Sequence, residues 1–358
     1  MASPSSVKTS VSQYYTSLEN TQSLKTNACE TSSAPPSYIL SALKNVSPSV
    51  ISKYYGCGLC IPPLLSGTTV VDLGCGSGRD AYIISQLSGS KGKVYGVDMT
   101  EAQLDVAKGA MEYHGGLECE TSEVEFVESY IESFAEEIGL EEDVDVVVSN
   151  CVINLSPDKE AVLRQAYKCL KSGGELYFSD VYASRRVPES LRKDPVLWGE
   201  CISGALYWND FVNLAKKVGF ADPRLVSDAP ITIKNKEIEK KCEGIEFYSA
   251  TYRLFKLETL EPDCEDYGQA VIYKGTIPEC PVAFELDSHH RMEKGKVFPV
   301  CGNTWRMLKE TRFKEHFEYI GNFDNHFGIF EGCGKAIPYE SASGNGGGGG
   351  GGGDGGCC

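Results

Sequence analysis

The sequence lacks the features that would direct it to a membrane, a secretory route or a nucleic acid. It has no stretch of about 18 apolar residues, so we expect no membrane-spanning helix. No basic segment followed by an apolar one stands at the N-terminus, so a secretory signal is not expected, although the Ser/Thr-rich start leaves another targeting segment open. Basic residues number 34 against 50 acidic ones, and the net charge of −16 gives no general attraction to phosphate backbones. We therefore expect a cytoplasmic protein with neither nucleic acid nor membrane as a partner.

Cysteine, by contrast, is abundant, with 15 in the chain. An odd number cannot be fully paired within one chain, and without a secretory signal a disulfide scaffold is not favoured. Thiols kept for metal or redox chemistry are the better interpretation. The CxxC of Cys57 and Cys60 is not favoured as a zinc site, because no second CxxC or CxxH exists. Nor does it open a helix after a strand, as a thioredoxin motif does.

The most informative stretch is TVVDLGCGSGRD at residues 69–80. An apolar run that contains Asp72 leads into alternating glycines, the pattern of a buried strand, a glycine turn and the start of a helix. Glycines allow positive φ angles and a close approach of a ligand, and the helix N-terminus offers free N–H groups. A second strand ends in Asp98, where a ribose would need an acceptor. Together these features predict a nucleoside-binding crevice.

The spacing of the glycines favours one nucleoside ligand over another. Dinucleotide sites carry G-x-G-x-x-G, whereas this chain has G-x-G-x-G followed by Arg79. The acid at Asp72 also favours a ligand with a cationic amino-acid end. S-adenosylmethionine has such an end and no phosphate, so it is the predicted ligand, with a dinucleotide as the weaker alternative.

Strand and helix patterns alternate between about residues 68 and 228, which predicts an α/β fold with a parallel, Rossmann-like sheet. We expect strands at 69–73, 93–98, 124–128, 145–150, 175–180 and 223–227, and helices at 79–87, 101–113, 132–138, 158–170 and 208–217. Thr100 and Gln103 fit a capping box, and Ser156 and Pro157 fit the start of helix 158–170, which should end at Gly173. Asp72, Asp98, Asn150 and Asp180 then fall at the carboxyl ends of strands, where ligands bind in such sheets.

The remaining chain divides by composition. Residues 1–67 form a lead-in that carries Cys29 and Cys57, with helix expected over 37–54. Segments 245–257 and 270–274 are rich in β-branched and aromatic residues, which predicts a small, mainly antiparallel second domain over 229–283. Aromatic residues in 284–340 indicate a folded segment without an assignable role. Residues 341–358 are a flexible glycine-rich tail ending in Cys357 and Cys358.

Several strings of the sequence resemble the arsenite methyltransferases: YYGCGL, DLGCGSGRD, SNCVINLSPDK, GGELYFSDVY and LWGECISGALYW. The similarity covers about residues 25–275, and more weakly the chain up to about 335. It implies a class I methyltransferase domain, a smaller arsenic-binding region and a C-terminal segment. It also implies detoxification by methyl transfer from S-adenosylmethionine to trivalent arsenic.

The resemblance gives roles to four cysteines. Arsenite, or its complex with thiols, is implied to exchange onto Cys57, Cys151 and Cys201. Cys29 is implied to form a disulfide with Cys57 that returns the product arsenic to the trivalent state. A thiol reductant such as thioredoxin or glutathione is then implied to reset the enzyme. The preference of soft trivalent arsenic for thiolates agrees with this set.

The resemblance also implies contacts to the methyl donor. Asp98 should accept the ribose hydroxyls, Met99 and Ile131 should flank the adenine, and Asp72 or Arg79 should hold the methionine end. The implied set is Asp72, Gly74, Cys75, Gly76, Gly78, Arg79, Asp98, Met99, Gln103, Ile131 and Asn150. Cys75 is expected to make its contact through its backbone.

Two other functions stay open at this stage. A methyltransferase for a small organic acceptor would need a general base and no thiol cluster. A non-catalytic arsenic-binding protein would use the same cysteines without methyl transfer. The other cysteines, Cys169 on the apolar face of its helix among them, are interpreted as ordinary core or surface residues.

Overall fold

The computed structural model describes residues 35–54, 59–192, 194, 197–198, 201–233, 235–333 and 335. The chain divides into two compact units between Lys256 and Leu257, and each is described by itself. Cys29, Cys57 and the tail cysteines lie outside the described residues. No helix in the described ranges is long and apolar enough to cross a membrane.

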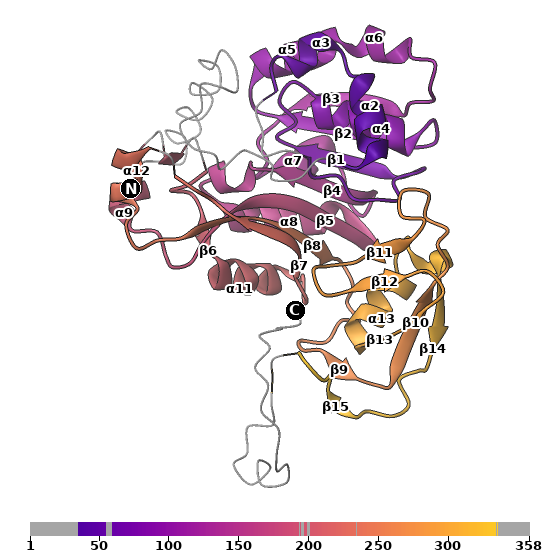
Figure 1. The fold of residues 1–358 in the computed structure, drawn as a ribbon. Coiled ribbons are helices and arrows are strands. Elements are labelled where there is room, and N and C mark those ends of the chain that lie inside the picture. The colour runs from indigo at the N-terminus through magenta and orange to yellow at the C-terminus, as the bar shows by residue number, and fades with distance from the viewer. Residues whose placement is uncertain are drawn as a thin grey trace. The chain divides into compact units, whose positions relative to one another are not determined.

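The first unit is built on an eight-stranded sheet with the order β3-β2-β1-β4-β5-β8-β7, and with β6 paired to β5 (Figure 1). Its strands are β1 (Thr69–Leu73), β2 (Lys93–Asp98), β3 (Glu123–Glu128), β4 (Val144–Asn150), β5 (Leu170–Ala183), β6 (Leu206–Tyr207), β7 (Arg224–Pro230) and β8 (Phe247–Phe255). Strand β8 runs antiparallel to both β5 and β7, while the other pairs are parallel. The predicted Rossmann-like α/β fold is confirmed, but the sheet is mixed and not parallel as predicted, because β8 runs antiparallel to its neighbours.

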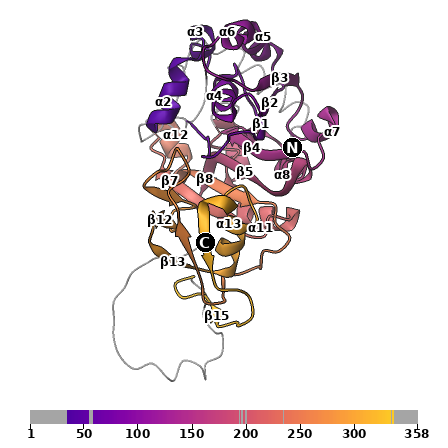
Figure 2. The same ribbon diagram turned by 90° about the vertical axis from the view of Figure 1, so that its right-hand side faces the viewer.

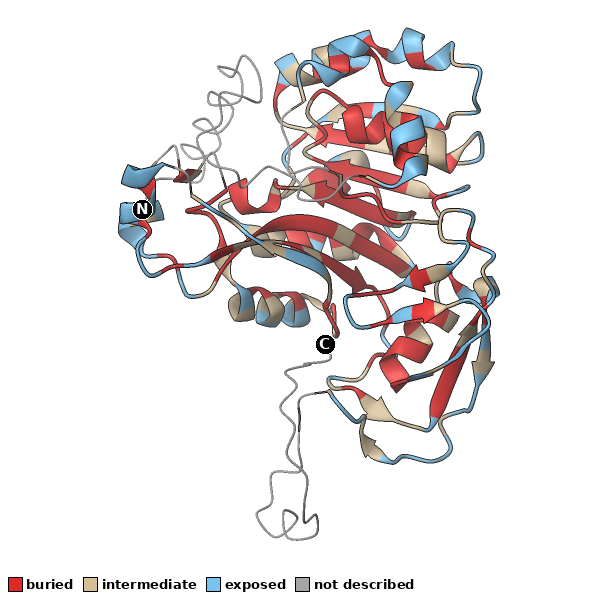
Figure 3. Cartoon of the chain, viewed as in Figure 1, coloured by how far each residue is buried: buried red, intermediate tan, exposed pale blue. Residues whose placement is uncertain are grey.

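Helices cover both faces of this sheet (Figure 2). They are α2 (Ser37–Lys44), α3 (Pro48–Ile51), α4 (Arg79–Ser88), α5 (Glu101–Gly109), α6 (Met111–Gly115), α7 (Phe134–Ile138), α8 (Lys159–Cys169), α9 (Glu189–Arg192), α11 (Trp208–Val218) and α12 (Lys236–Lys241), with the 3-10 turn η2 (Ile153–Leu155). Helices α2 to α5 pack on one face through residues such as Ile39 and Ile84. Helices α7, α8 and α11 pack on the other through Phe134, Val162 and Phe211. The central strands are consequently buried on both sides (Figure 3).

The register of the strands brings the predicted ligand residues to one edge. Leu73, the last residue of β1, pairs with Val97, the residue before Asp98. Asn150, the last residue of β4, pairs with Ser179 of β5. The glycine turn, Asp98 and Asn150 therefore lie at the carboxyl edge, as the strand order predicts for a ligand site.

Local capping differs from prediction in ways that follow from competing hydrogen bonds. Helix α8 starts one residue later than expected, and its N-cap is Asp158, whose carboxylate accepts from the Ala161 N–H at 2.9 Å. The Ser156 hydroxyl instead donates to Glu132. Thr100 makes no side-chain cap hydrogen bond, so the predicted capping box is wrong. The predicted helix 101–113 is interrupted after Gly109, a residue with poor helix propensity.

The largest correction concerns the end of the first unit. Helix α8 passes directly into β5 at Leu170, without ending at Gly173. The segment Phe247–Phe255, expected in a second domain, is β8 of the main sheet. Its Arg253 is 1% exposed and pairs with buried Glu175 of β5 at 2.7 Å. The expected region 229–283 is thus divided between the two units.

The second unit is mainly antiparallel. Its strands are β9 (Glu265–Asp266), β10 (Gln269–Tyr273), β11 (Ala283–Glu285), β12 (Arg291–Glu293), β13 (Val297–Val300), β14 (Phe317–Ile320) and β15 (Gly328–Ile329), with helix α13 (Gly302–Lys309) and the turn η3 (Lys314–His316). Strands β13-β10-β14 form one sheet, and β11-β12 and β9-β15 form pairs. The aromatic residues Tyr273, Phe284, Phe313 and Phe317 pack together as its core. The segment 284–335 is therefore folded, as its aromatic content predicts.

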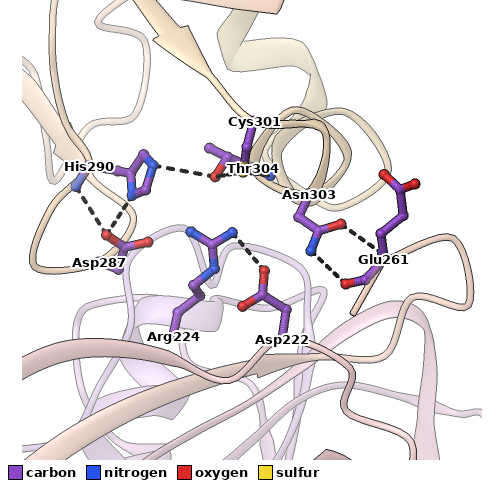
Figure 4. A network of polar contacts seen from close by, with 8 residues as sticks. All are labelled: Asp222, Arg224, Glu261, Asp287, His290, Cys301, Asn303 and Thr304. Carbon is purple, nitrogen blue, oxygen red and sulfur yellow. Dashed lines mark hydrogen bonds and ion pairs between the residues drawn. The ribbon is translucent and has the colours of Figure 1, made fainter. Parts of the chain in front are cut away.

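A buried polar network fixes the start of α13 in this unit. Asp287 pairs with His290 Nδ1 at 2.7 Å, and His290 Nε2 lies 3.4 Å from the Thr304 hydroxyl (Figure 4). The Thr304 N–H donates to the sulfur of Cys301, the N-cap residue of α13. These hydrogen bonds give the network a structural role in the folding of the second unit.

Candidate active site

The glycine turn after β1 is held against the end of β2. The N–H groups of Gly74 and Cys75 both donate to the Val97 carbonyl, at 2.7 and 3.0 Å. Gly74 and Gly78 have φ angles of 70° and 88°. A Cβ at Gly74 would lie 2.3 Å from Val152, and one at Gly78 would lie 2.9 Å from the ring of Phe126. Only glycine fits these two positions, so the turn leaves its backbone open toward the edge of the sheet.

Asp98 is locked in place by the backbone around it. One carboxylate oxygen accepts from the Gly76 N–H at 2.9 Å, and the other accepts from the Thr100 N–H at 2.8 Å. Each oxygen of a carboxylate can accept more than one hydrogen bond. Burial raises the pKa of this carboxyl, and the backbone donors partly offset that effect. Asp98 is thus oriented to accept from a ligand such as a ribose.

Two other predicted contacts carry buried polar atoms that lack partners. Among the described residues, Asp72 Oδ2 and Gln103 Oε1 have no hydrogen-bond partner. An unsatisfied buried acceptor costs about 1–3 kcal/mol, which a bound donor would recover. Burial, and then the negative charges of Asp80 and Asp98, raise the pKa of Asp72, while Arg79 lowers it. These acceptors fit a ligand with an ammonium group, as S-adenosylmethionine has.

The remaining predicted contacts differ in how they are placed. The Cys75 side chain is buried in the core on the α4 face, and burial raises the pKa of its thiol well above the ordinary value. Only its backbone is left for a ligand, in line with expectation. Met99 and Ile131 are both half-buried, and they pack on two different hydrophobic clusters. Their predicted place on either side of the adenine stays a prediction.

A cluster of four side chains joins the turn to the end of β4. The Arg79 guanidinium contacts Asp80 at 2.7 Å and lies 3.2 Å from the ring centroid of Tyr54. Asn150 Nδ2 donates to the Tyr54 hydroxyl at 3.1 Å and lies 3.5 Å from Asp80 Oδ2. Sequence reasoning missed Tyr54 and Asp80. The position of Asp80 directly after the turn was a usable signal, whereas Tyr54 had none.

The structure brings two of the predicted arsenic ligands together. Cys151 directly follows Asn150, and the Cys201 thiol donates to the Cys151 carbonyl at 3.0 Å. Both residues have positive φ angles, 56° and 64°, which non-glycine residues rarely adopt. Such strain persists where surrounding structure imposes it, and it gathers at functional sites. Cys57 and Cys29, the other two predicted cysteines, lie outside the described residues.

Cys151 is disulfide-bonded in this structure. No other cysteine of the described ranges is disulfide-bonded. Sequence reasoning did not foresee a disulfide at Cys151. A cysteine in a disulfide has no thiolate to offer to arsenic, so this bond must be reduced before arsenic can bind there.

Two buried charged side chains, Lys159 and Asp180, contact the segment 154–156. Lys159 Nζ donates to the carbonyls of Asn154 and Ser156, and burial lowers the pKa of this ammonium to about 8. Asp180 accepts from the Asn154 and Val181 N–H groups, and burial raises its pKa to about 6. The negative charge of Asp180 favours the protonated form of Lys159, whereas the positive charge of Arg192 opposes it. Lys159 is also close enough to Cys201 to interact with it electrostatically.

The glycine turn, Asp98 and the mixed sheet define a methyltransferase with a Rossmann-like fold that uses S-adenosylmethionine. A family model described as a methyltransferase domain matches residues 64–219. The chain is similar in structure to an arsenic(III) S-adenosylmethionine methyltransferase from Chlamydomonas reinhardtii, with a TM-score of 0.78 and 47% sequence identity. That similarity covers 83% of this chain and 100% of the algal one.

Further comparisons show which family of methyltransferases the chain is similar to. A model described as the arsenite methyltransferase C-terminal domain matches residues 267–334. The arsenite methyltransferase of Aquipseudomonas alcaligenes is 57% identical over 92% of this chain and 96% of its own length. That of Rattus norvegicus is 45% identical over 88% of this chain and 86% of its own. The chain belongs to the arsenite methyltransferase family.

Proposed function

We propose that the chain methylates trivalent arsenic held by the thiolates of Cys57, Cys151 and Cys201, and that the methylated arsenicals are products of detoxification. The observation that carries this proposal is the hydrogen bond from the Cys201 thiol to the Cys151 carbonyl. It joins two chain positions 50 residues apart. It does so directly after Asn150, at the same edge as the glycine turn.

The donor site is assigned to residues of the first unit. Asp98 accepts the ribose hydroxyls, and Asp72 accepts the ammonium of the methionine end. Gln103 offers its buried amide oxygen to a donor of the ligand, and the backbone of the turn from Gly74 to Gly78 lies along it. When bound, S-adenosylmethionine supplies a methyl group attached to a sulfonium sulfur. After the transfer, this sulfur is the neutral thioether of the product.

The acceptor site is assigned to the three thiolates. The cysteines replace the ligands of arsenite or of its complex with thiols. Each cysteine thiol that replaces a hydroxide on arsenic releases one water. Three thiolates satisfy a soft trivalent centre and keep its lone pair available for the methyl carbon. Orientation and a dry site do most of the catalysis, a contribution that reaches about 7–11 kcal/mol in well-aligned reactions.

Methylation leaves the arsenic formally pentavalent, so a second methylation needs two electrons. We assign them to a pair of thiols, Cys29 and Cys57, which form a disulfide as the arsenic returns to the trivalent state. An external thiol such as thioredoxin or glutathione then reduces the disulfide. The presence of a disulfide at Cys151 supports a reductant as a required partner. We place this cycle in the cytoplasm, where such thiols are kept reduced, and cell fractionation tests that location.

The test is arsenic speciation over time, with S-adenosylmethionine and a thiol reductant, in the wild type and in Cys→Ser variants. Cys151→Ser and Cys201→Ser should form at least about 100-fold less methylated product, because a hydroxyl is a poor ligand for soft arsenic. Both should still bind S-adenosylmethionine. Cys29→Ser should make the monomethylated product and fail in the later round. Methylation of an organic acceptor at full rate by Cys201→Ser, or arsenic binding without any methyl transfer, would point to one of the alternative functions.

A further inference from the structure

We propose that Tyr54 is a positioning residue of the methyl-donor site, holding Arg79 with its ring and the Asn150 carboxamide with its hydroxyl. The inference rests on the proposed function only for the identity of the donor. None of the predicted contacts included Tyr54, which lies before the first strand of the methyltransferase domain.

The ring of Tyr54 fixes the guanidinium. The distance of 3.2 Å between Arg79 Cζ and the ring centroid places the cation directly on the aromatic face. Arg79 is 9% exposed, so the contact is sheltered from water, where cation–π attraction is strongest. The edge of the guanidinium is held by Asp80, whose carboxylate accepts from Arg79 Nε at 2.7 Å. Ring and carboxylate together leave Arg79 a single orientation beside the turn.

The hydroxyl of Tyr54 fixes the amide. It accepts from Asn150 Nδ2 at 3.1 Å, across 96 residues of sequence. Asn150 ends β4 and directly precedes Cys151, whose backbone carries a positive φ. A side chain that holds Asn150 therefore also steadies the position from which the first thiol of the acceptor site projects.

The segment that carries Tyr54 is itself anchored. The Ser77 hydroxyl, within the glycine turn, donates to the Val50 carbonyl of α3 at 3.0 Å. The Ser47 N–H donates to His114 Nε2 at 3.2 Å. Tyr54 thus stands three residues beyond a helix tied to the donor turn, and three residues before Cys57 in the sequence. This placement lets one residue align the donor turn with the end of β4.

The test compares Tyr54→Phe and Tyr54→Ala by calorimetric titration with S-adenosylmethionine and with its demethylated product, without arsenic. Loss of the hydroxyl should weaken binding about fivefold, the value of one neutral hydrogen bond. Loss of the ring as well should weaken it by about 100-fold, because the cation–π contact goes too. Tyr248→Phe, which removes a hydroxyl bonded to exposed Glu246, is the matched control and should bind as the wild type does.

If Tyr54 acted only in folding, its variants would lose thermal stability and not affinity. Thermal unfolding of the ligand-free variants separates these two roles. Tyr54→Phe keeps the ring and should keep the melting temperature. Arg79→Lys retains the charge without the planar face, so its loss of affinity should not add to that of Tyr54→Ala. Wild-type affinity in a folded Tyr54→Ala, or full additivity with Arg79→Lys, would overturn the proposal. A wild type that binds the donor but never methylates arsenic would refute the proposed function and leave this inference standing.

Discussion

At the scale of single residues, the proposed donor site contains a buried carboxylate, Asp72, whose position lowers the stability of the ligand-free fold. Asp72 is 3% exposed, and one of its oxygens lacks a hydrogen-bond partner among the described residues. Its neighbours Asp80 and Asp98 add negative charge, which Arg79 only partly compensates. Such an arrangement is unfavourable for the ligand-free fold and favourable for a cationic ligand.

Asp72→Asn tests this trade between stability and binding. The raised pKa means that the folded protein holds the Asp72 proton more tightly than the unfolded chain does. The free energy of unfolding therefore falls as pH rises above the unfolded pKa of about 4, and at neutral pH the carboxylate destabilises the fold. The variant should melt at a higher temperature without ligand, and should bind S-adenosylmethionine roughly 10- to 100-fold more weakly, having lost a charge-assisted hydrogen bond.

The exposed acid Asp105 of α5 supplies the control. Asp105→Asn should change neither the melting temperature nor the affinity measurably. An Asp72→Asn protein that melts earlier than the wild type, or binds the donor equally well, would show that the buried carboxylate has another role.

Single residues also show which parts of the candidate site could be predicted from the sequence and which could not. The glycine turn, Asp98 and Asn150 could be predicted because each follows a strand pattern at a fixed distance. The contact between Tyr54 and Asn150 could not, since no local pattern records a pairing 96 residues apart. The left-handed backbone of Cys151 and Cys201 was equally hidden, because tertiary contacts impose it on residues without such a preference.

At the scale of elements, the N-terminal helices depend on one neutral histidine. His114 is 5% exposed; its Nδ1 lies 2.8 Å from the Ala110 carbonyl, and its Nε2 accepts from the Ser47 N–H. The ring also stacks on Tyr82, with centroids 3.5 Å apart. One nitrogen donates and the other accepts, so this geometry requires the uncharged imidazole.

Acidification should therefore loosen this attachment. Burial lowers the pKa of His114, so as pH falls the unfolded chain takes up the proton before the folded one. Stability should be fully present above about pH 6.5 and decline below it, by at most about 1.4 kcal/mol per pH unit from this group. Denaturant titrations of the wild type between pH 7 and 5 should show a steeper decline than those of His114→Gln. Equal slopes would contradict the assignment, and His289→Gln, at an exposed position, should reproduce the wild-type slope.

The hydrophobic pattern of the sequence predicted some strands and helices of the first unit and not the position of others. The order of strands and helices from β1 to β5 could be predicted because each strand is a short apolar run and each helix an amphipathic one. The position of β8 in the sheet could not be predicted, because the sequence of a strand does not show which strands it pairs with. An arginine such as Arg253 would be expected at the surface, and its burial is explained only by its ion pair with Glu175 of β5.

At the scale of the molecule, the two units correspond to the two matched families. The methyltransferase model covers residues 64–219 of the first unit, and the C-terminal model covers 267–334 of the second. The residues proposed for the donor site, and the proposed arsenic ligands Cys151 and Cys201, belong to the first unit. The proposed function therefore depends on one edge of its sheet, with Cys57 proposed to complete the set of thiolates.

The central claim is that three cysteines bind arsenic beside this edge, and arsenic X-ray absorption counts its sulfur ligands directly. The protein is reduced, freed of reductant and loaded with one equivalent of arsenite. We predict three sulfur neighbours in the wild type and in Cys119→Ser, which removes an exposed free thiol. We predict two in Cys57→Ser, Cys151→Ser and Cys201→Ser. Three sulfur ligands in any of these three variants would contradict it.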